Sequence, residues 1–168
     1  MEKEYEIIDN LLNEHDFQAI RSLMLPTHGQ DNQFQWHWGD RKTSTTDGRE
    51  DEDSNFQFVH FLYSGFPALS KSSYFSVILP ILAELKGVIG LVRIKVNLET
   101  NKGAQLKSSF HWDYHTPSES EHEKEMPYPN VHVAIYYVNT NNGYTELEGG
   151  TKVKSVANRL LLFPNTMK

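Results

Sequence analysis

From Leu91 onward, apolar residues recur with a period of two, the spacing of a β-strand with one buried face. The first such strand has an apolar face and a polar face, carrying Val92, Ile94, Val96 and Leu98 on the one and Arg93, Lys95 and Asn97 on the other. Further strands are predicted at residues 131–139 and 159–163, separated by turn signals at 101–103 and 141–143. The C-terminal half is therefore predicted to be mainly β-sheet.

The N-terminal half carries helical signals. Asn13 is a predicted helix N-cap, and the apolar residues that follow it at helical spacing are Phe17, Ile20, Leu23 and Met24. A second helix is predicted after Ser72 or Ser73, and we expect Pro80 to kink it. Residues 5–8 and 56–63 are predicted strands. Helices first and strands later indicate a β-sandwich or barrel with an α-helical layer packed against it.

Composition sets limits on fold and function. The length of 168 residues suggests one domain, residues 1–168. The net charge of -6 gives no support for binding nucleic acid or an anionic membrane. The chain has no cysteine, which excludes disulfides and thiolate metal sites. With no apolar signal core and no apolar run near the roughly 18 residues of a membrane helix, we expect a soluble, cytoplasmic protein.

The polar stretch of residues 27–55 contains an acidic cluster at 50–53. We predict a solvated loop there, with a cation or partner site as the alternative. Residues 119–125 form a second polar, charged segment, predicted to be a loop beside the histidine and aspartate discussed next.

His111 and Asp113 form a His-x-Asp pair shortly after the polar-faced strand. Residues at i and i+2 project to the same side of an extended chain, so one imidazole and one carboxylate would converge, as facial metal coordination requires. The alternative is a surface His-Asp pair in a loop. The remaining candidate histidines are interpreted as ordinary polar or surface residues; they are His37, His60, His115 and His132.

Residues 131–139 form the most regular predicted strand. One face carries Val131, Val133, Ile135 and Tyr137, and the other carries His132, Ala134 and Tyr136. A tyrosine on an apolar strand face either packs in the core or directs its hydroxyl toward a ligand. Both interpretations of Tyr137 remain at this stage.

The order of these features resembles a known enzyme family. The polar-faced strand is followed by His111-x-Asp113, the strand of Tyr137, the Gly-Gly-Thr turn at 149–151 and the Ala-Asn-Arg-Leu-Leu-Leu-Phe-Pro segment at 157–164. This set is similar to the Fe(II)/2-oxoglutarate-dependent oxygenases, specifically the prolyl-4-hydroxylase-like branch in its small marine phage and bacterial form. The resemblance spans essentially the whole chain, including the aromatic residues 34–38.

The resemblance implies a double-stranded β-helix (jelly roll) with N-terminal helices packed on one sheet. It assigns His111 and Asp113 as iron ligands, and Tyr137 and Asn97 as contacts to 2-oxoglutarate. The strand at 159–164 would lead to a third ligand, a histidine about one residue past Lys168. An arginine for the cosubstrate carboxylate would follow roughly ten residues later. We therefore expect a C-terminally truncated oxygenase that lacks its last two strands.

The activity implied by the resemblance is hydroxylation of a C–H bond coupled to oxidative decarboxylation of 2-oxoglutarate. The implied cofactors are Fe(II) and 2-oxoglutarate, with ascorbate as an optional reductant, and O₂ is the co-substrate. The substrate is an unknown small molecule or peptide, with residues 34–38 and 116–129 as hypothetical substrate-side elements. Without its last strands the fragment is expected to be inactive, and its open sheet edge predicts a homodimer as one outcome.

Two alternatives remain from the sequence. One is a non-catalytic jelly-roll binding module or an inactive remnant of an enzyme. The other is a cupin-type metalloenzyme that does not use 2-oxoglutarate. That enzyme would need several histidines around His111, and the sequence offers only His115 as a neighbour.

Overall fold

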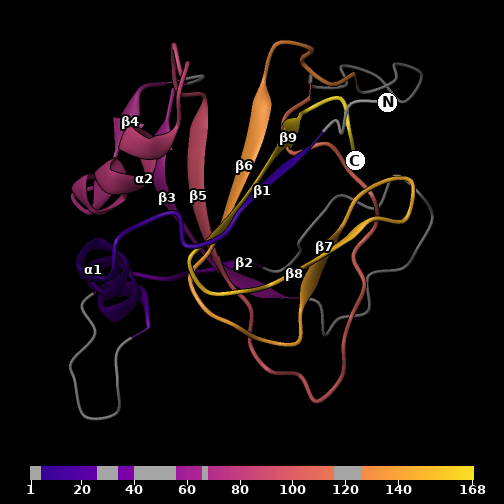
Figure 1. Cartoon of the computed structure of the whole chain (residues 1–168), viewed down its shortest axis with the longest axis horizontal. Coiled ribbons are helices and arrows are strands. Elements are labelled where there is room, and N and C mark those ends of the chain that lie inside the picture. Colours follow the sequence, from indigo (N-terminus) through magenta and orange to yellow (C-terminus); the bar gives the residue numbers. More distant parts are fainter. Residues whose placement is uncertain (1–4, 26–33, 40–55, 66–67, 116–125) are drawn as a thin grey trace. The chain divides into compact units, whose positions relative to one another are not determined.

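The computed structural model describes residues 5–25, 34–39, 56–65, 68–115 and 126–168 (Figure 1). These residues form two compact units, one made of Met1–Leu11 with Phe110–Lys168 and the other of Leu12–Ser109. Within the described ranges the protein is mainly β-sheet with two short α-helices, which confirms the predicted mainly-β class. The prediction of a single domain stays a prediction.

In the unit Leu12–Ser109, four antiparallel strands form one sheet around a long central strand. The strands are β2 (His37–Gly39), β3 (Gln57–Ser64), β4 (Ser70–Lys71) and β5 (Arg93–Leu98). β2 pairs with the first residues of β3, and β4 pairs with the last residues of β3. β5 runs along β3 from Phe58 to Ser64. The register shifts between Phe61 and Tyr63, and Leu62 at this irregularity is fully buried.

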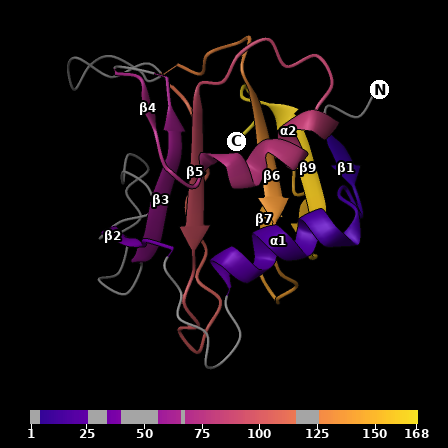
Figure 2. The same ribbon diagram turned by 90° about the vertical axis from the view of Figure 1, so that its left-hand side faces the viewer.

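The same unit contains the helices α1 (Glu14–Met24) and α2 (Leu79–Glu84), with the 3-10 turn η1 (Phe75–Ile78) directly before α2. The predicted cap is confirmed, because the Asn13 side chain accepts a hydrogen bond from the backbone N–H of Asp16. α1 contacts η1, so the helical segments of this unit lie together (Figure 2). Pro80 does not kink a longer helix as expected. It lies in the first turn of α2, where a missing N–H costs nothing.

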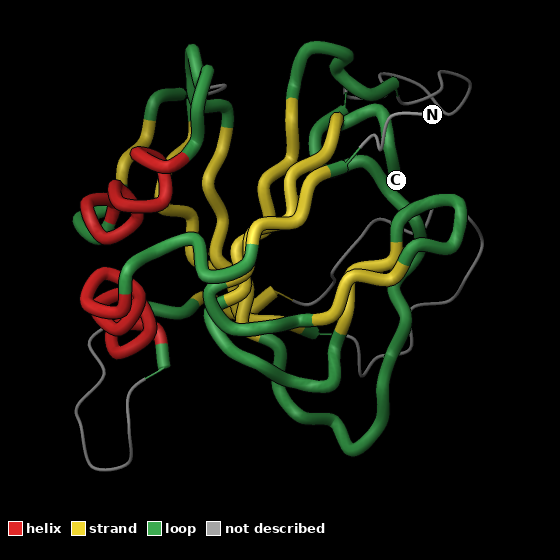
Figure 3. The backbone as a smooth tube through the Cα atoms, viewed as in Figure 1, coloured by secondary structure: helices red, strands yellow, loops and turns green. Residues whose placement is uncertain are grey.

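The other unit combines a three-stranded sheet with a separate hairpin (Figure 3). The sheet has the order β1-β9-β6, all antiparallel, and the hairpin pairs β7 with β8. The bounds are β1 (Glu6–Ile8), β6 (His132–Tyr137), β7 (Tyr144–Glu146), β8 (Lys152–Lys154) and β9 (Arg159–Pro164). β9 is the central strand, and its Leu160 and Leu161 are completely buried.

One hydrophobic cluster holds this unit together. Its buried members come from β8, β9 and the residue after β7, and they are Leu147, Val153, Leu161 and Phe163. The predicted apolar face of β6 packs against this cluster through Val133, Ile135 and Tyr137. The predicted face assignment of that strand is therefore confirmed. No helix in the described part of the chain is long and apolar enough to cross a membrane.

Candidate functional site

The His-x-Asp segment lies outside the regular strands. The chain bends at Asp113 and Tyr114, and His115 forms an isolated bridge with Pro127. His111 is exposed, whereas Asp113 is partly buried. The extended conformation that the sequence suggested is interrupted at Asp113, so convergence of the two side chains stays a prediction.

The chain that leaves β9 holds this segment on both sides of Asp113. The backbone N–H of Tyr114 donates to Asn165 Oδ1 at 3.1 Å, and Asn165 Nδ2 donates to the carbonyl oxygen of Tyr114 at 2.5 Å. On the other side, Trp112 Nε1 donates to the carbonyl oxygen of Thr166 at 3.3 Å. Lys168 adds a cation-π contact, with its Nζ 3.9 Å from the centre of the Trp112 ring. Residues 112–114 are thus attached directly to the end of β9.

Tyr137 is the last residue of β6, opposite Arg159 of β9. Its ring packs against the hydrophobic cluster, and its hydroxyl donates to Thr145 Oγ1 at 2.7 Å. Burial raises the pKa of this hydroxyl, while the hydrogen bond with Thr145 and the charge of Arg159 oppose the shift. The phenol therefore stays neutral at ordinary pH. Its oxygen retains acceptor capacity besides the bond that it donates.

Asn97 lies on β5, in the unit Leu12–Ser109, where it is exposed and pairs with Val59 of β3. On the same predicted polar face Arg93 is exposed and Lys95 is partly buried. The other three candidate residues, His111, Asp113 and Tyr137, belong to the other unit. The assignment of Asn97 to the cosubstrate stays a prediction.

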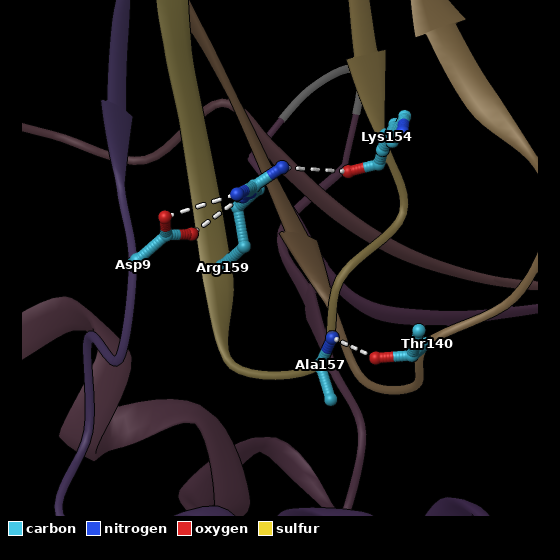
Figure 4. A network of polar contacts seen from close by, with 5 residues as sticks. All are labelled: Asp9, Thr140, Lys154, Ala157 and Arg159. Carbon is cyan, nitrogen blue, oxygen red and sulfur yellow. Dashed lines mark hydrogen bonds and ion pairs between the residues drawn. The ribbon is translucent and has the colours of Figure 1, made fainter.

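Arg159 is the nearest arginine to Tyr137 along the β6–β9 pair, but its guanidinium is already engaged. It forks onto Asp9, with Nε 2.5 Å from Oδ1 and Nη2 2.9 Å from Oδ2 (Figure 4). Nη1 also donates to the carbonyl oxygen of Lys154 at 3.2 Å. The hydrogen bond from Arg159 lowers the pKa of Asp9. This network joins the end of β1 to β9, and nearby Ala157 N donates to Thr140 Oγ1 at 2.9 Å.

Among the described residues, the other histidines do not form a metal cluster. His37 and His132 are exposed. His60, unlike the surface histidine that the sequence allowed, is only 5% exposed and has both ring nitrogens hydrogen-bonded. The carbonyl of Gln35 can only accept, so Nδ1 carries the proton and Nε2 accepts from the Ser72 hydroxyl. His60 therefore has a structural role.

Asn165 and Thr145 are the residues that sequence reasoning missed. Asn165 is completely buried and contacts the His-x-Asp segment, and Thr145 binds the candidate cosubstrate tyrosine. An asparagine after a predicted strand indicates a local turn, which does not identify the distant backbone partners of Asn165. The acidic cluster 50–53 and the segment 116–125 lie outside the described residues.

His111 and Asp113 supply part of the ligand set that a hard or borderline divalent metal needs. An imidazole from His111 and a carboxylate from Asp113 are two of the three ligands of a facial triad. Within the residues that the structure describes, no group of three or more His, Asp or Glu side chains is placed to hold a metal ion. A third protein ligand therefore has no candidate in the described ranges.

Comparisons with known proteins give no family. A scan against protein-family models, a search of curated proteins and a search of solved structures each found no match. The candidate site therefore depends on the residues of this chain and their contacts.

Proposed function

We propose that this chain belongs to an Fe(II)/2-oxoglutarate-dependent oxygenase of the prolyl-4-hydroxylase-like type. In the proposal His111 and Asp113 hold iron, and Tyr137 contacts 2-oxoglutarate. The bound metal supplies the O₂ chemistry that couples decarboxylation of the keto acid to hydroxylation of a substrate C–H bond. The single observation that carries the proposal is the attachment of the His-x-Asp segment to the residues after β9.

That attachment matters because of where a third ligand would have to come from. Asn165 and Thr166 contact Tyr114 and Trp112, which flank Asp113. A histidine supplied by the chain just after these residues would enter the neighbourhood of both candidate donors. Facial coordination needs such a third donor from a separate segment. The contacts thus support the predicted order of ligands, His-x-Asp first and a histidine after β9.

The strand pairing supports the finer fold assignment. The β7–β8 hairpin lies in sequence between β6 and β9, which pair with each other in a different sheet. Nested antiparallel pairs divided between two sheets are the connectivity of the middle four strands of a jelly roll. We therefore assign β6 to β9 as those strands of a double-stranded β-helix.

The same assignment predicts what pairs with the open edges. Among the described strands, β6 pairs only with β9, and β7 only with β8. A jelly roll covers these two edges with its last two strands. A second copy of the chain is the other occupant that a free edge attracts, and it would give a homodimer.

The decisive experiment begins with the DNA that follows the codon for Lys168. We expect the next codon to encode a histidine and a codon roughly ten residues later to encode an arginine. The protein extended by those residues should form succinate from 2-oxoglutarate only with Fe(II) and O₂. His111→Ala and Asp113→Ala should each abolish this reaction, whereas His132→Ala, which removes an exposed histidine on β6, should not. Turnover that survives either ligand substitution would contradict the iron assignment.

A non-catalytic jelly-roll module is the second candidate, and one observation favours it. The Tyr137 hydroxyl already has a protein partner in Thr145 and its ring packs in the core, so its position needs no ligand. This candidate predicts that the extended protein binds neither Mn(II) nor 2-oxoglutarate. Calorimetric titration with each would separate the two proposals without depending on an unknown substrate.

A further inference from the structure

A buried carboxamide next to the candidate metal ligands is the feature that neither the sequence nor the proposed chemistry accounts for. Asn165 is completely buried, and each half of its amide has a backbone partner. Its Oδ1 accepts from the N–H of Tyr114, and its Nδ2 donates to the carbonyl oxygens of Tyr114 at 2.5 Å and Tyr128 at 3.4 Å. Its own backbone N–H donates to the carbonyl oxygen of Val131 at 2.9 Å.

We propose that Asn165 is a positioning residue that fixes the backbone of the His-x-Asp segment for metal binding. We name the contacts of Asn165, together with the hydrogen bond from Trp112 to Thr166, the β9 clasp. The inference rests on the proposed function for its metal-binding part. It goes further by naming a residue that touches neither metal nor cosubstrate and acts through Asp113.

The geometry of the peptide group explains how the clasp acts. The N–H of Tyr114 lies in the same planar unit as the Cα and carbonyl of Asp113. Holding that N–H therefore fixes the ψ angle of Asp113 and with it the direction in which the carboxylate leaves the backbone. The second bond, from Asn165 Nδ2 to the Tyr114 carbonyl, fixes the next peptide as well. Two bonds from one rigid amide prevent this pair of peptides from rotating independently.

The residue on the other side of Asp113 is held from the same place. Trp112 Nε1 donates to the carbonyl oxygen of Thr166, directly after Asn165 in sequence. Asp113 is thus anchored before and after by adjacent residues of one segment. Such an arrangement is needed where the chain bends, because the bend at Asp113 and Tyr114 leaves this stretch without a regular strand ladder. Groups that orient metal ligands typically change metal affinity about 10- to 100-fold when they are removed.

The test measures amide exchange of the backbone and binding of a metal ion separately, in the whole chain. For the backbone, amide hydrogen exchange of Tyr114 is followed by NMR. We expect Asn165→Ala to speed exchange of the Tyr114 amide about 10-fold, because that amide loses its hydrogen-bond acceptor. For the metal, Mn(II) is added as a paramagnetic probe with oxygen and nitrogen preferences close to those of Fe(II). It should broaden the amide signals of His111 and Asp113, and the variant should need about 10-fold more Mn(II) for the same broadening.

Val153→Ala is the matched control. It truncates a side chain that is 2% exposed in the hydrophobic cluster, so it lowers stability without touching the clasp. We expect faster exchange in β9 but unchanged exchange of Tyr114 and unchanged Mn(II) broadening. If Asn165→Ala does not fold, Trp112→Phe keeps a smaller aromatic ring beside Lys168 and removes the indole donor to Thr166. It should speed exchange of the 112–114 amides about 3-fold.

The outcomes are distinguishable. Unchanged exchange of Tyr114 in Asn165→Ala would overturn the inference, whatever the metal does. Faster exchange with unaltered Mn(II) broadening would overturn its positioning part. If Mn(II) broadens neither His111 nor Asp113 in the wild type, the iron proposal fails and the metal part of the inference fails with it, while faster exchange would still establish the clasp.

Discussion

His60 and Asn165 belong to different units of the protein, and both are buried polar side chains that hydrogen-bond to other segments. His60 lies on β3 and bonds to the carbonyl oxygen of Gln35 at 2.6 Å and to Ser72 Oγ at 2.8 Å. Asn165 follows β9 and bonds to the backbones of Tyr114 and Tyr128. Each side chain thus ties two irregular segments to one strand.

The surroundings of the two side chains differ. The imidazole of His60 is packed among aromatic rings, with centroids 4.7 Å from Phe34 and 5.6 Å from Tyr74. Asn165 bonds mainly to backbone groups, two of them on the residue after a candidate metal ligand. We therefore expect His60 to act mainly on stability and Asn165 mainly on local geometry. A buried polar residue indicates function only when its partners belong to a site.

Truncation of His60 should have the largest effect on stability. His60→Ala would leave a cavity among aromatic rings and two polar groups without their partner. We expect it to lower the free energy of unfolding by about 3 kcal/mol. His60→Phe should lower it by about 1.5 kcal/mol, because the ring contacts remain and only the hydrogen bonds are lost. Urea unfolding followed by tryptophan fluorescence would measure both.

His132→Ala provides the control, since His132 is an exposed histidine of β6 and surface substitutions stay within about 0.5 kcal/mol. If His60→Ala lowered the free energy of unfolding no more than this control, His60 would not stabilise the fold as its contacts indicate. If His60→Ala left exchange of the Tyr114 amide unchanged, the two buried side chains would act independently.

Thr145→Val should have an intermediate effect, within the unit that contains Asn165. It keeps the shape of the side chain and removes the acceptor for the Tyr137 hydroxyl, which should lower stability by about 1 kcal/mol. The pKa of Tyr137 should rise further, because the Thr145 hydroxyl can turn to donate to the ionised phenolate, and this hydrogen bond is one of the two effects that oppose burial. Spectrophotometric titration of the phenol measures this, with Tyr137→Phe as the reference. A pKa that falls in Thr145→Val would show that this hydrogen bond does not favour the ionised form.

Local structure followed closely from sequence. The cap at Asn13 and the apolar spacing of Phe17, Ile20 and Met24 predicted α1, and the period of two predicted β5 and β6. These signals are short-range, because each depends on residues within a few positions of one another. Pro80 was misjudged because the same residue either kinks a helix or begins one, and only the neighbouring turn decides which.

Pairing and the site were much less predictable. Glu6 pairs with Leu162, and nothing in the pattern of either strand identifies the other as its partner. The sequence nominated His111, Asp113 and Tyr137 by motif, yet the residues that contact them or their neighbours, Thr145 and Asn165, carry no long-range signal. Buried polar contacts depend on three-dimensional proximity, so a single sequence reveals the donors of a site sooner than their supports.

The pair of Asp9 and Arg159 should have the smallest effect, with a defined pH dependence. Arg159 lowers the pKa of Asp9, so the pair stabilises the fold above the unfolded pKa of about 3.9. That contribution is lost as the pH falls through the lower pKa of the folded state. Because the Asp9 side chain is 53% exposed, solvent screening limits the effect of Asp9→Asn at pH 7 to about 0.5 kcal/mol.

The measurement compares unfolding free energies of wild type and Asp9→Asn at pH 7 and near pH 2.5, with Glu6→Gln as an exposed carboxylate control on β1. The difference caused by Asp9→Asn should shrink at the lower pH and in high salt, whereas the control should show no such pattern. A difference that is equal at both pH values would contradict a charge effect. The hydrogen-bonded pairing of β1 with β9 would then hold the first strand without help from this ion pair.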